Sequence, residues 1–151
     1  MRQKTYITRN VIETKQLGRK LGERLKGGEV FELISDLGGG KTTWVSGLAE
    51  GFGSSDSVAS PSFTISYVYG RPDKKALHHF DFYRLNEPGV AASELSEVVG
   101  DSDVVTVVEW GSIVHDVLPE DRVKIQILAL SEEERQFDIE FSPAHEYLFK
   151  P

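Results

Sequence analysis

Apolar residues near the start of the chain recur with the spacing of a helix. A leucine stands at every fourth position from 17 to 25, and lysines and arginines fill the other faces, so this segment predicts an amphipathic helix with one apolar stripe. Asn10 precedes it at the position of an N-cap, with Glu13 three residues later as in a capping box. Two glycines at 27 and 28 are expected to end this helix.

Most later apolar residues fall in short runs bounded by turn residues, which is typical of strands. We expect strands over residues 29–35, 62–69, 76–83, 104–108, 123–130 and 136–141. The turn-rich residues 70–75 join the second and third of these, and the last two are expected to pair antiparallel. The run at 104–108 is almost entirely valine, the pattern of a strand buried on both faces of a sheet. Helices are expected over 42–52 and 90–99, and residues 142–151 are interpreted as a tail. Because helices alternate with strands, the pattern predicts one α/β domain over residues 1–151.

Composition narrows the kinds of protein that the chain can be. It is 39% hydrophobic and 27% charged, as in an ordinary globular domain. The absence of cysteine excludes disulfides, thiolate zinc sites and cysteine nucleophiles, and it favours a reducing cytoplasm. No apolar run approaches the roughly 20 residues of a membrane helix, and the N-terminus lacks the apolar core of a signal peptide. We therefore expect a cytoplasmic protein with no membrane partner.

Charge is spread unevenly along the chain. The net charge of −7 argues against a protein whose main surface grips nucleic acid. Residues 1–26 nevertheless carry eight Lys or Arg and two Asp or Glu, whereas residues 86–121 carry nine acidic residues and no Lys or Arg. Two interpretations stay open, namely ordinary solvated faces or two surfaces for different partners.

The most informative segment is Ser35-Asp36-Leu37-Gly38-Gly39-Gly40-Lys41-Thr42-Thr43, between a predicted strand and a predicted helix. This is the setting of a phosphate-binding P-loop. Its glycines let backbone N–H groups turn toward an anion, and the following helix points its N-terminus at the same place. Lys41 would reach the outer phosphates, and the Thr42 hydroxyl would ligate Mg²⁺. Ser35 replaces the first glycine of the usual G-x-x-x-x-G-K-[ST] pattern. The segment predicts a P-loop NTPase-like sheet of mixed parallel and antiparallel strands flanked by helices.

Two carboxylates follow predicted strands and complete a set of candidate catalytic residues with Lys41. Glu109 comes directly after the valine run, where a Walker B-type acid lies, because strand C-termini converge on the ligand in such sheets. Asp81 lies near the C-terminal end of the strand expected over residues 76–83. Which of the two orients water is left open, as is the alternative that either is an ordinary exposed acid. With no cysteine and no spaced third ligand, His78 and His79 are interpreted as strand residues rather than metal ligands.

Four blocks of residues follow one another in a specific order. They are Glu13-Thr14 with Leu17-Gly18 and Leu21; Asp36 to Thr43; Ser60-Pro61-Ser62-Phe63-Thr64; and His79-Phe80-Asp81-Phe82-Tyr83-Arg84-Leu85, followed later by Glu109-Trp110. In this combination the chain resembles, from Asn10 to Phe141, the TsaE (YjeE) family of small P-loop ATPases in bacterial tRNA threonylcarbamoyladenosine synthesis. The chain differs from the usual family pattern at three positions, with Ser35 in place of glycine, Gly39 in place of alanine and Ser62 in place of threonine. These differences bear on the tightness of the phosphate-binding loop and on the rate of ATP hydrolysis.

The resemblance implies ATP (or ADP) and Mg²⁺ as cofactors. It also implies action on the TsaD–TsaB pair, which transfers the threonylcarbamoyl group to an adenosine of tRNA, so that tRNA is met only through the complex. By the family pattern, Thr42 and Glu109 would hold Mg²⁺, Asp81 would join the metal or its water, and Thr64 would lie near the γ-phosphate. Residues 36–43 would bind the phosphates, and Asn10 would lie near the adenine. Because no arginine finger is evident apart from Arg84 or a partner's arginine, ATP hydrolysis is expected to be slow without partners.

Two other functions stay open. A small-molecule P-loop kinase would need basic residues that close over the phosphates, and residues 86–121 contain none. A GTPase is disfavoured as well, because the sequence has no Asn-Lys-x-Asp segment to read guanine. A nucleotide-gated binding module would use ATP and ADP to bias residues 60–64 between two conformations, with incidental hydrolysis. Within the tRNA-modification pathway that the resemblance implies, the basic residues of the first helix are candidates to face an acidic partner surface or a nearby tRNA backbone. They are Lys15, Arg19, Lys20 and Arg24.

Overall fold

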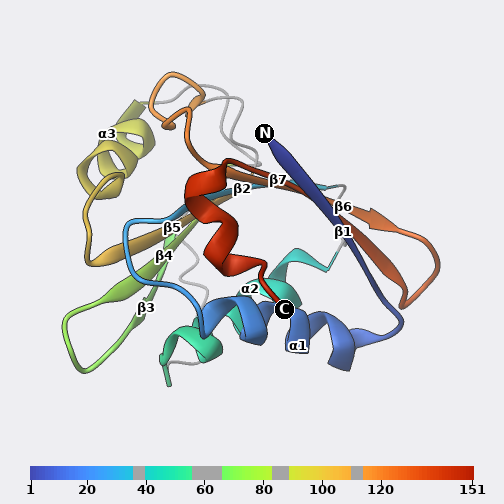
Figure 1. The fold of residues 1–151 in the computed structure, drawn as a ribbon. Coiled ribbons are helices and arrows are strands. Elements are labelled where there is room, and N and C mark those ends of the chain that lie inside the picture. The colour runs from blue at the N-terminus through green and yellow to red at the C-terminus, as the bar shows by residue number, and fades with distance from the viewer. Residues whose placement is uncertain (36–39, 56–65, 83–88, 110–113) are drawn as a thin grey trace.

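The computed structural model describes residues 1–35, 40–55, 66–82, 89–109 and 114–151. These parts of the chain form a seven-stranded sheet with helices on both faces (Figure 1). In chain order the elements are β1 (Arg2–Thr8), α1 (Val11–Gly22), β2 (Val30–Ser35), α2 (Lys41–Phe52), β3 (Ser66–Gly70), β4 (Ala76–Asp81), α3 (Gly89–Val98), β5 (Val104–Glu109), β6 (Val123–Ala129), β7 (Arg135–Phe141) and the 3₁₀ helix η2 (Pro143–Leu148). None of the helices within these ranges is long and apolar enough to cross a membrane.

Parallel strands form the middle of the sheet, and antiparallel pairs form its two sides. The strand order is β1-β7-β6-β2-β5-β4-β3. β2 runs parallel to both β5 and β6, and β4 runs parallel to β5. β3 pairs antiparallel with β4, as do β7 with β6 and β1 with β7. The predicted mixed α/β sheet is therefore confirmed, together with the antiparallel pairing of its last two predicted strands.

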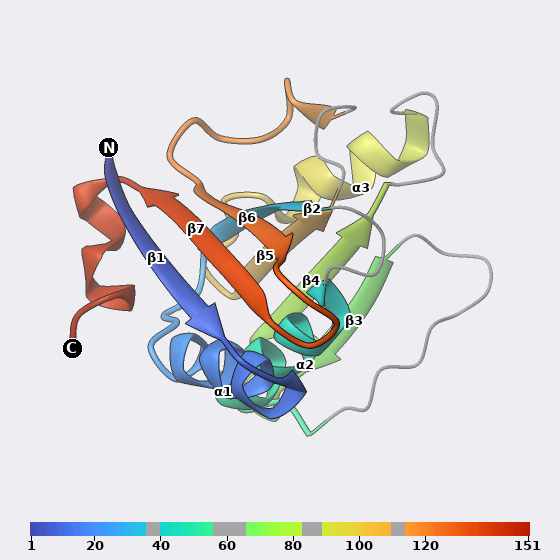
Figure 2. The same ribbon diagram turned by 90° about the vertical axis from the view of Figure 1, so that its right-hand side faces the viewer.

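The two faces of the sheet have separate cores. α1, α2 and η2 cover one face, where Phe31, Trp44 and Leu148 are completely buried. α3 covers the opposite face (Figure 2), where Leu95 packs with Phe80 from β4. Because β5 lies between both layers, all six of its residues are buried, as its run of valines predicts.

α1 begins at the predicted cap but ends early. Asn10 Oδ1 accepts a hydrogen bond from the Glu13 N–H at 2.9 Å, and Glu13 Oε1 accepts one from the Arg9 N–H at 2.9 Å. The α-helix stops at Gly22 instead of continuing to the glycine pair. Beyond it the N–H groups of residues 24 and 25 bond to carbonyls three residues back, so the chain tightens into a 3₁₀-type turn. Leu25 nevertheless stays buried as the end of the leucine stripe.

Glycines bring α1 and α2 into backbone contact. A Cβ placed on Gly18 of α1 would overlap the carbonyl oxygen of Trp44, and a Cβ placed on Gly47 of α2 would overlap that of Lys15. Gly22 and Gly51 meet the opposite helix in the same way. Only a residue without a side chain permits this approach, so four glycines fix how α2 lies against α1.

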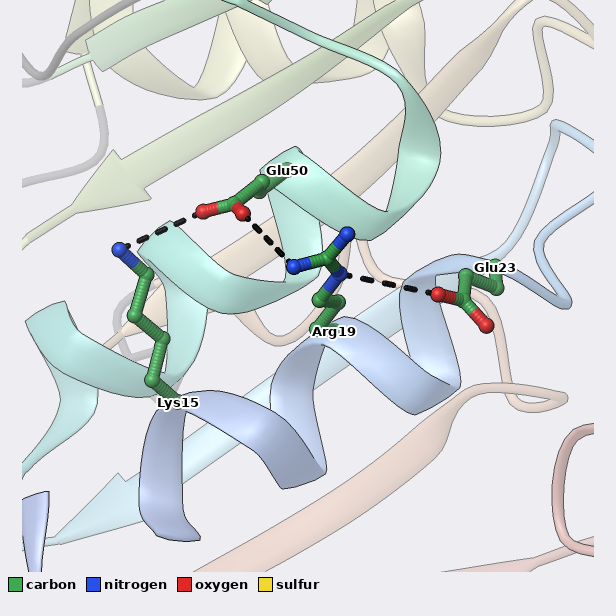
Figure 3. A network of polar contacts seen from close by, with 4 residues as sticks. All are labelled: Lys15, Arg19, Glu23 and Glu50. Atoms are coloured by element: carbon green, nitrogen blue, oxygen red, sulfur yellow. Dashed lines mark hydrogen bonds and ion pairs between the residues drawn. The ribbon is translucent and has the colours of Figure 1, made fainter. Parts of the chain in front are cut away.

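Charged side chains lie over this helix crossing. Glu50 of α2 contacts Lys15 Nζ at 3.3 Å and Arg19 Nη1 at 3.2 Å, and Arg19 Nε lies 3.7 Å from Glu23 (Figure 3). Arg24 donates to the Leu148 carbonyl at 2.9 Å. Three of the four basic residues considered for a partner surface therefore have partners within the chain. This favours the interpretation of the basic first helix as an ordinary solvated face.

Two segments differ from the sequence prediction. The pattern predicts no element over Arg2–Thr8, yet these residues form β1, in which Tyr6 packs against the core while its neighbours on either side are exposed. The predicted tail over 142–151 is wrong, because this segment contains η2 and buries Leu148 and Phe149. Two apolar side chains in a short segment give no periodicity, so only their tertiary contacts decide that they are buried.

Candidate nucleotide-binding site

Helix α2 begins where the predicted phosphate loop ends. Gly40 is its N-cap, with a left-handed φ of 92° that favours glycine, and Lys41 is its first residue. The first turn of such a helix presents unpaired backbone N–H groups and a partial positive charge, which suit an anion. Thr42 is exposed at this end and Thr43 is half-buried. The preceding loop residues 36–39 lie outside the described residues.

Lys41 and Glu109 meet in a buried pair. Lys41 Nζ lies 3.7 Å from Glu109 Oε1, and the two side chains are 10% and 5% exposed. Opposite charges so far from water stabilise each other, whereas either one alone would be costly to bury. Burial raises the pKa of Tyr69 to about 12, and Tyr67 and the Glu109 carboxylate add to this effect. The Lys41–Glu109 pair thus lies in a largely desolvated part of the molecule.

The carboxyl ends of the parallel strands converge on this pair. Asp81, the last residue of β4, is the register partner of Glu109 in β5, and Leu33 of β2 is the partner on the other side. The Phe82 N–H donates to the Glu109 carbonyl at 3.1 Å, which continues the strand contact beyond Asp81. The structure therefore brings Lys41, Asp81 and Glu109 to one edge of the sheet, at the start of α2.

His79 is a neighbour of the site to which the sequence pattern gives only a strand role. Its Nε2 lies 3.0 Å from Glu109 Oε2, and both side chains are 5% exposed. Its ring lies beside that of Tyr67, with centroids 5.5 Å apart. Alternate residues of a strand share a face, so His79 lies on the same face as Asp81, two residues later. That spacing is the signal that relates His79 to the site.

The oxygen donors at this edge fit a magnesium ion. Carboxylates and hydroxyls are the ligands that Mg²⁺ prefers, and Thr42, Asp81 and Glu109 supply them from α2, β4 and β5. Within the described ranges, no three His, Cys, Asp or Glu side chains group closely enough to hold a metal ion by themselves. An ion bound here would therefore take further ligands from nucleotide phosphates and water.

A hollow of about 170 Å³ opens beside Gly40. Its lining residues are Val11, Thr14, Gly40, Thr43, Glu133 and Arg135. Arg135 lies against Gly40, and its guanidinium donates to the carbonyls of Ser131 and Glu134 at 2.9 Å each. A single arginine at the start of a strand has no local signature, so the sequence pattern does not identify it. The predicted Asn10 caps α1 directly before Val11, so it lies next to the hollow.

Several predicted site residues lie outside the part of the chain that the structure describes. They are Asp36, Leu37, Gly38, Gly39, Ser60, Pro61, Ser62, Phe63, Thr64, Arg84 and Trp110. Their assignments stay predictions.

The fold and the site together define an α/β protein of the P-loop NTPase-like class. Its sheet has parallel central strands, a helix starts at a lysine after one strand, and an acid stands at the end of the adjacent strand. A family model described as "Threonylcarbamoyl adenosine biosynthesis protein TsaE" matches residues 8–137. The chain belongs to the TsaE family, which functions in tRNA threonylcarbamoyladenosine biosynthesis. This confirms the resemblance drawn from its motifs.

Individual relatives agree with the family match. The tRNA threonylcarbamoyladenosine biosynthesis protein TsaE of Streptomyces coelicolor is 40% identical over 114 residues, which are 75% of this chain and 77% of that protein. The Bacillus subtilis protein of the same name is 35% identical over 138 residues, or 90% and 84% of the two chains. A crystal structure of Bacillus subtilis YdiB superposes with a TM-score of 0.77 at 32% identity, covering 98% of this chain and 92% of the other.

Proposed function

We propose that this chain is a Mg²⁺-dependent ATPase that supports threonylcarbamoyladenosine formation in tRNA. The observation that carries the proposal is the buried contact between Lys41, at the first turn of α2, and Glu109, at the end of β5. Phosphoryl transfer needs positioning and charge neutralisation more than covalent help from the protein. A lysine, a helix N-terminus and a carboxylate at one sheet edge supply those requirements.

Each site residue has a role in this proposal. Lys41 and the N–H groups of the first turn of α2 bind the outer phosphates. Thr42, Asp81 and Glu109 hold the metal ion directly or through water, and Glu109 or Asp81 orients the attacking water. A bound Mg²⁺ would supply charge neutralisation on the phosphate oxygens. The hollow beside Gly40 would take the nucleoside, with Arg135 as one wall.

The proposed partners are TsaD and TsaB, with tRNA met only through that complex. The net charge of −7 suits a chain that acts on proteins rather than on RNA directly. The sequence shows no evident arginine finger apart from Arg84 or an arginine of a partner. We therefore propose slow hydrolysis by the isolated chain and faster hydrolysis in the complex.

The test measures nucleotide binding, phosphate release and tRNA modification with the same protein. We expect Lys41→Ala to weaken ATP binding, and Glu109→Ala to retain binding while phosphate release falls by about 10² or more. TsaD and TsaB should accelerate phosphate release by the wild-type chain. Lys150→Ala, at an exposed position near the end of the chain, is the control and should leave ATP binding, phosphate release and tRNA modification unchanged.

Three results would redirect the proposal. Absence of ATP binding by the wild-type chain would contradict it outright. Transfer of phosphate to a small acceptor would indicate a kinase instead. Full tRNA modification with Glu109→Ala would indicate a nucleotide-gated binding module whose hydrolysis is incidental.

A further inference from the structure

We propose that His79 is a positioning residue that anchors one oxygen of Glu109 while the contact of the other oxygen with Lys41 exchanges on nucleotide binding. The inference deepens the proposed ATPase function and rests on it. It divides the contacts of Glu109 into a permanent one and a temporary one.

The two carboxylate oxygens of Glu109 have different partners. Oε1 faces Lys41 Nζ at 3.7 Å, and Oε2 faces His79 Nε2 at 3.0 Å. All three side chains are at least nine-tenths buried. Side chains buried to this extent have little access to water, so the two protein partners orient the carboxylate.

The two partners differ in how far they can move. Lys41 has a long flexible side chain at the end of a helix. His79 has a short side chain in the middle of β4, where it pairs in register with Val107 and its ring lies beside Tyr67. A phosphate that draws Lys41 away from Oε1 would leave Oε1 open to a metal ion or water, while His79 keeps Oε2 in place.

The Nε2 atom of His79 is available to hold Glu109 Oε2 in place. Among the residues that the structure describes, Nε2 has no aligned hydrogen-bond partner although it is buried. Buried polar atoms of this kind are uncommon and call for a partner. The Glu109 oxygen at 3.0 Å needs only a small rotation of either side chain to accept from it. A hydrogen bond from His79 thus leaves Glu109 with one protein partner when Lys41 turns to phosphate.

Nitrogen NMR of the nucleotide-free protein tests the contact without reference to activity. We expect a proton on His79 Nε2, and a changed resonance of that nitrogen in the Glu109→Gln variant. Spectra of His79→Gln assign the signal among the four histidines. A bare Nε2 in the wild-type chain, or His79 resonances unchanged by Glu109→Gln, would overturn the proposal whether or not the chain hydrolyses ATP.

The kinetics of two variants, His79→Asn and His79→Gln, then distinguish a positioning role of His79 from a purely structural one. The amide nitrogen of His79→Gln reaches about as far as Nε2, whereas that of His79→Asn does not. We expect His79→Asn to lower kcat about tenfold or more, with KM for ATP nearly unchanged, and His79→Gln to restore most of the rate. His78→Asn, on the opposite face of β4, is the control and should leave kcat unchanged. Equal losses in His79→Asn and His79→Gln, or no loss in either, would refute the positioning role.

Discussion

At the scale of single residues, two pairs of opposite charges are buried in the part of the chain that the structure describes. Glu32 and Arg122 lie 3.0 Å apart with side chains 9% and 6% exposed, and Arg122 also donates to the Pro119 carbonyl at 2.8 Å. Lys41 and Glu109 form the second such pair, at the candidate site. The two pairs differ in their place in the fold, because Arg122 also holds the Pro119 carbonyl, whereas Lys41 lies at the first turn of α2, where the proposed function places the phosphates. In that proposal the first pair is structural and the second exchanges on nucleotide binding.

His78 provides a residue-scale prediction about pH. Burial holds the pKa of His78 below its usual range, although the nearby Asp101 carboxylate opposes this. The unfolded chain therefore binds a proton at His78 at a higher pH than the folded chain, so stability falls as pH drops through about 6.5. We expect the free energy of unfolding to fall from pH 7.5 to pH 5.5, and to fall less in His78→Asn. Urea denaturation at the two pH values measures this, and an equal fall in both proteins would contradict it.

At the scale of elements, the crossing of α1 and α2 connects the first helix to the candidate site. α2 carries Lys41 at its first turn, and four glycines let its backbone rest on that of α1. α1 in turn begins at Val11 and carries Thr14, both of which line the hollow beside Gly40. Both helices therefore contribute to the walls of that hollow. The exposed charge network of Glu50 lies over the same crossing but contributes little to it, because water screens such pairs.

Gly47→Ala tests this helix contact. The added methyl would overlap the Lys15 carbonyl oxygen, and a backbone atom cannot move aside without separating the helices. We expect a loss of about 3 kcal/mol in the free energy of unfolding. Two controls on the same helix should matter less: Ser46→Ala should stay within about 0.5 kcal/mol, and Glu50→Gln should lose less than about 1 kcal/mol. Tolerance of Gly47→Ala equal to that of Ser46→Ala would show that the helices do not pack as described.

At the scale of the whole molecule, the C-terminal segment packs against elements from both the start and the end of the chain. The ring of Phe149 lies tilted against that of Phe141, with centroids 4.3 Å apart, and the Phe149 carbonyl accepts from Lys4 of β1 at 2.7 Å. The Tyr147 hydroxyl donates to Glu29 at 2.5 Å. Lys26 Nζ lies over the Tyr147 ring, 4.2 Å from the ring centroid. Through these contacts η2 covers the part of the helical face that α1 and α2 leave open (Figure 1).

Phe149→Ala tests whether this segment belongs to the core. The side chain is 2% exposed, so its removal would leave a cavity, and we expect a loss of about 3 kcal/mol in the free energy of unfolding. Lys150→Ala changes the exposed residue that follows and should stay within about 0.5 kcal/mol. Chemical denaturation of both variants measures the difference. Equal stability of the Phe149→Ala and Lys150→Ala variants would contradict the core role and support the interpretation of residues 142–151 as a tail.

The sequence by itself determined the features that depend on neighbours along the chain. The Asn10 cap, the leucine stripe, the valine strand and the strand-to-helix setting of Lys41 are all local patterns, since hydrogen bonding and burial within one element repeat with that element's period. The acids at the ends of β4 and β5 could also be predicted to share an edge with Lys41, because the C-termini of strands converge on the ligand in sheets of this kind.

Only the tertiary structure decided the features that depend on contacts between distant segments. β1 is a strand because β7 offers it an edge, and Leu148 and Phe149 are core residues because the helical face has room for them. The division of Glu109 between Lys41 and His79, and the position of Arg135 beside Gly40, join segments far apart in the chain. No spacing along the sequence encodes such pairs, because their distance is set by how whole elements pack.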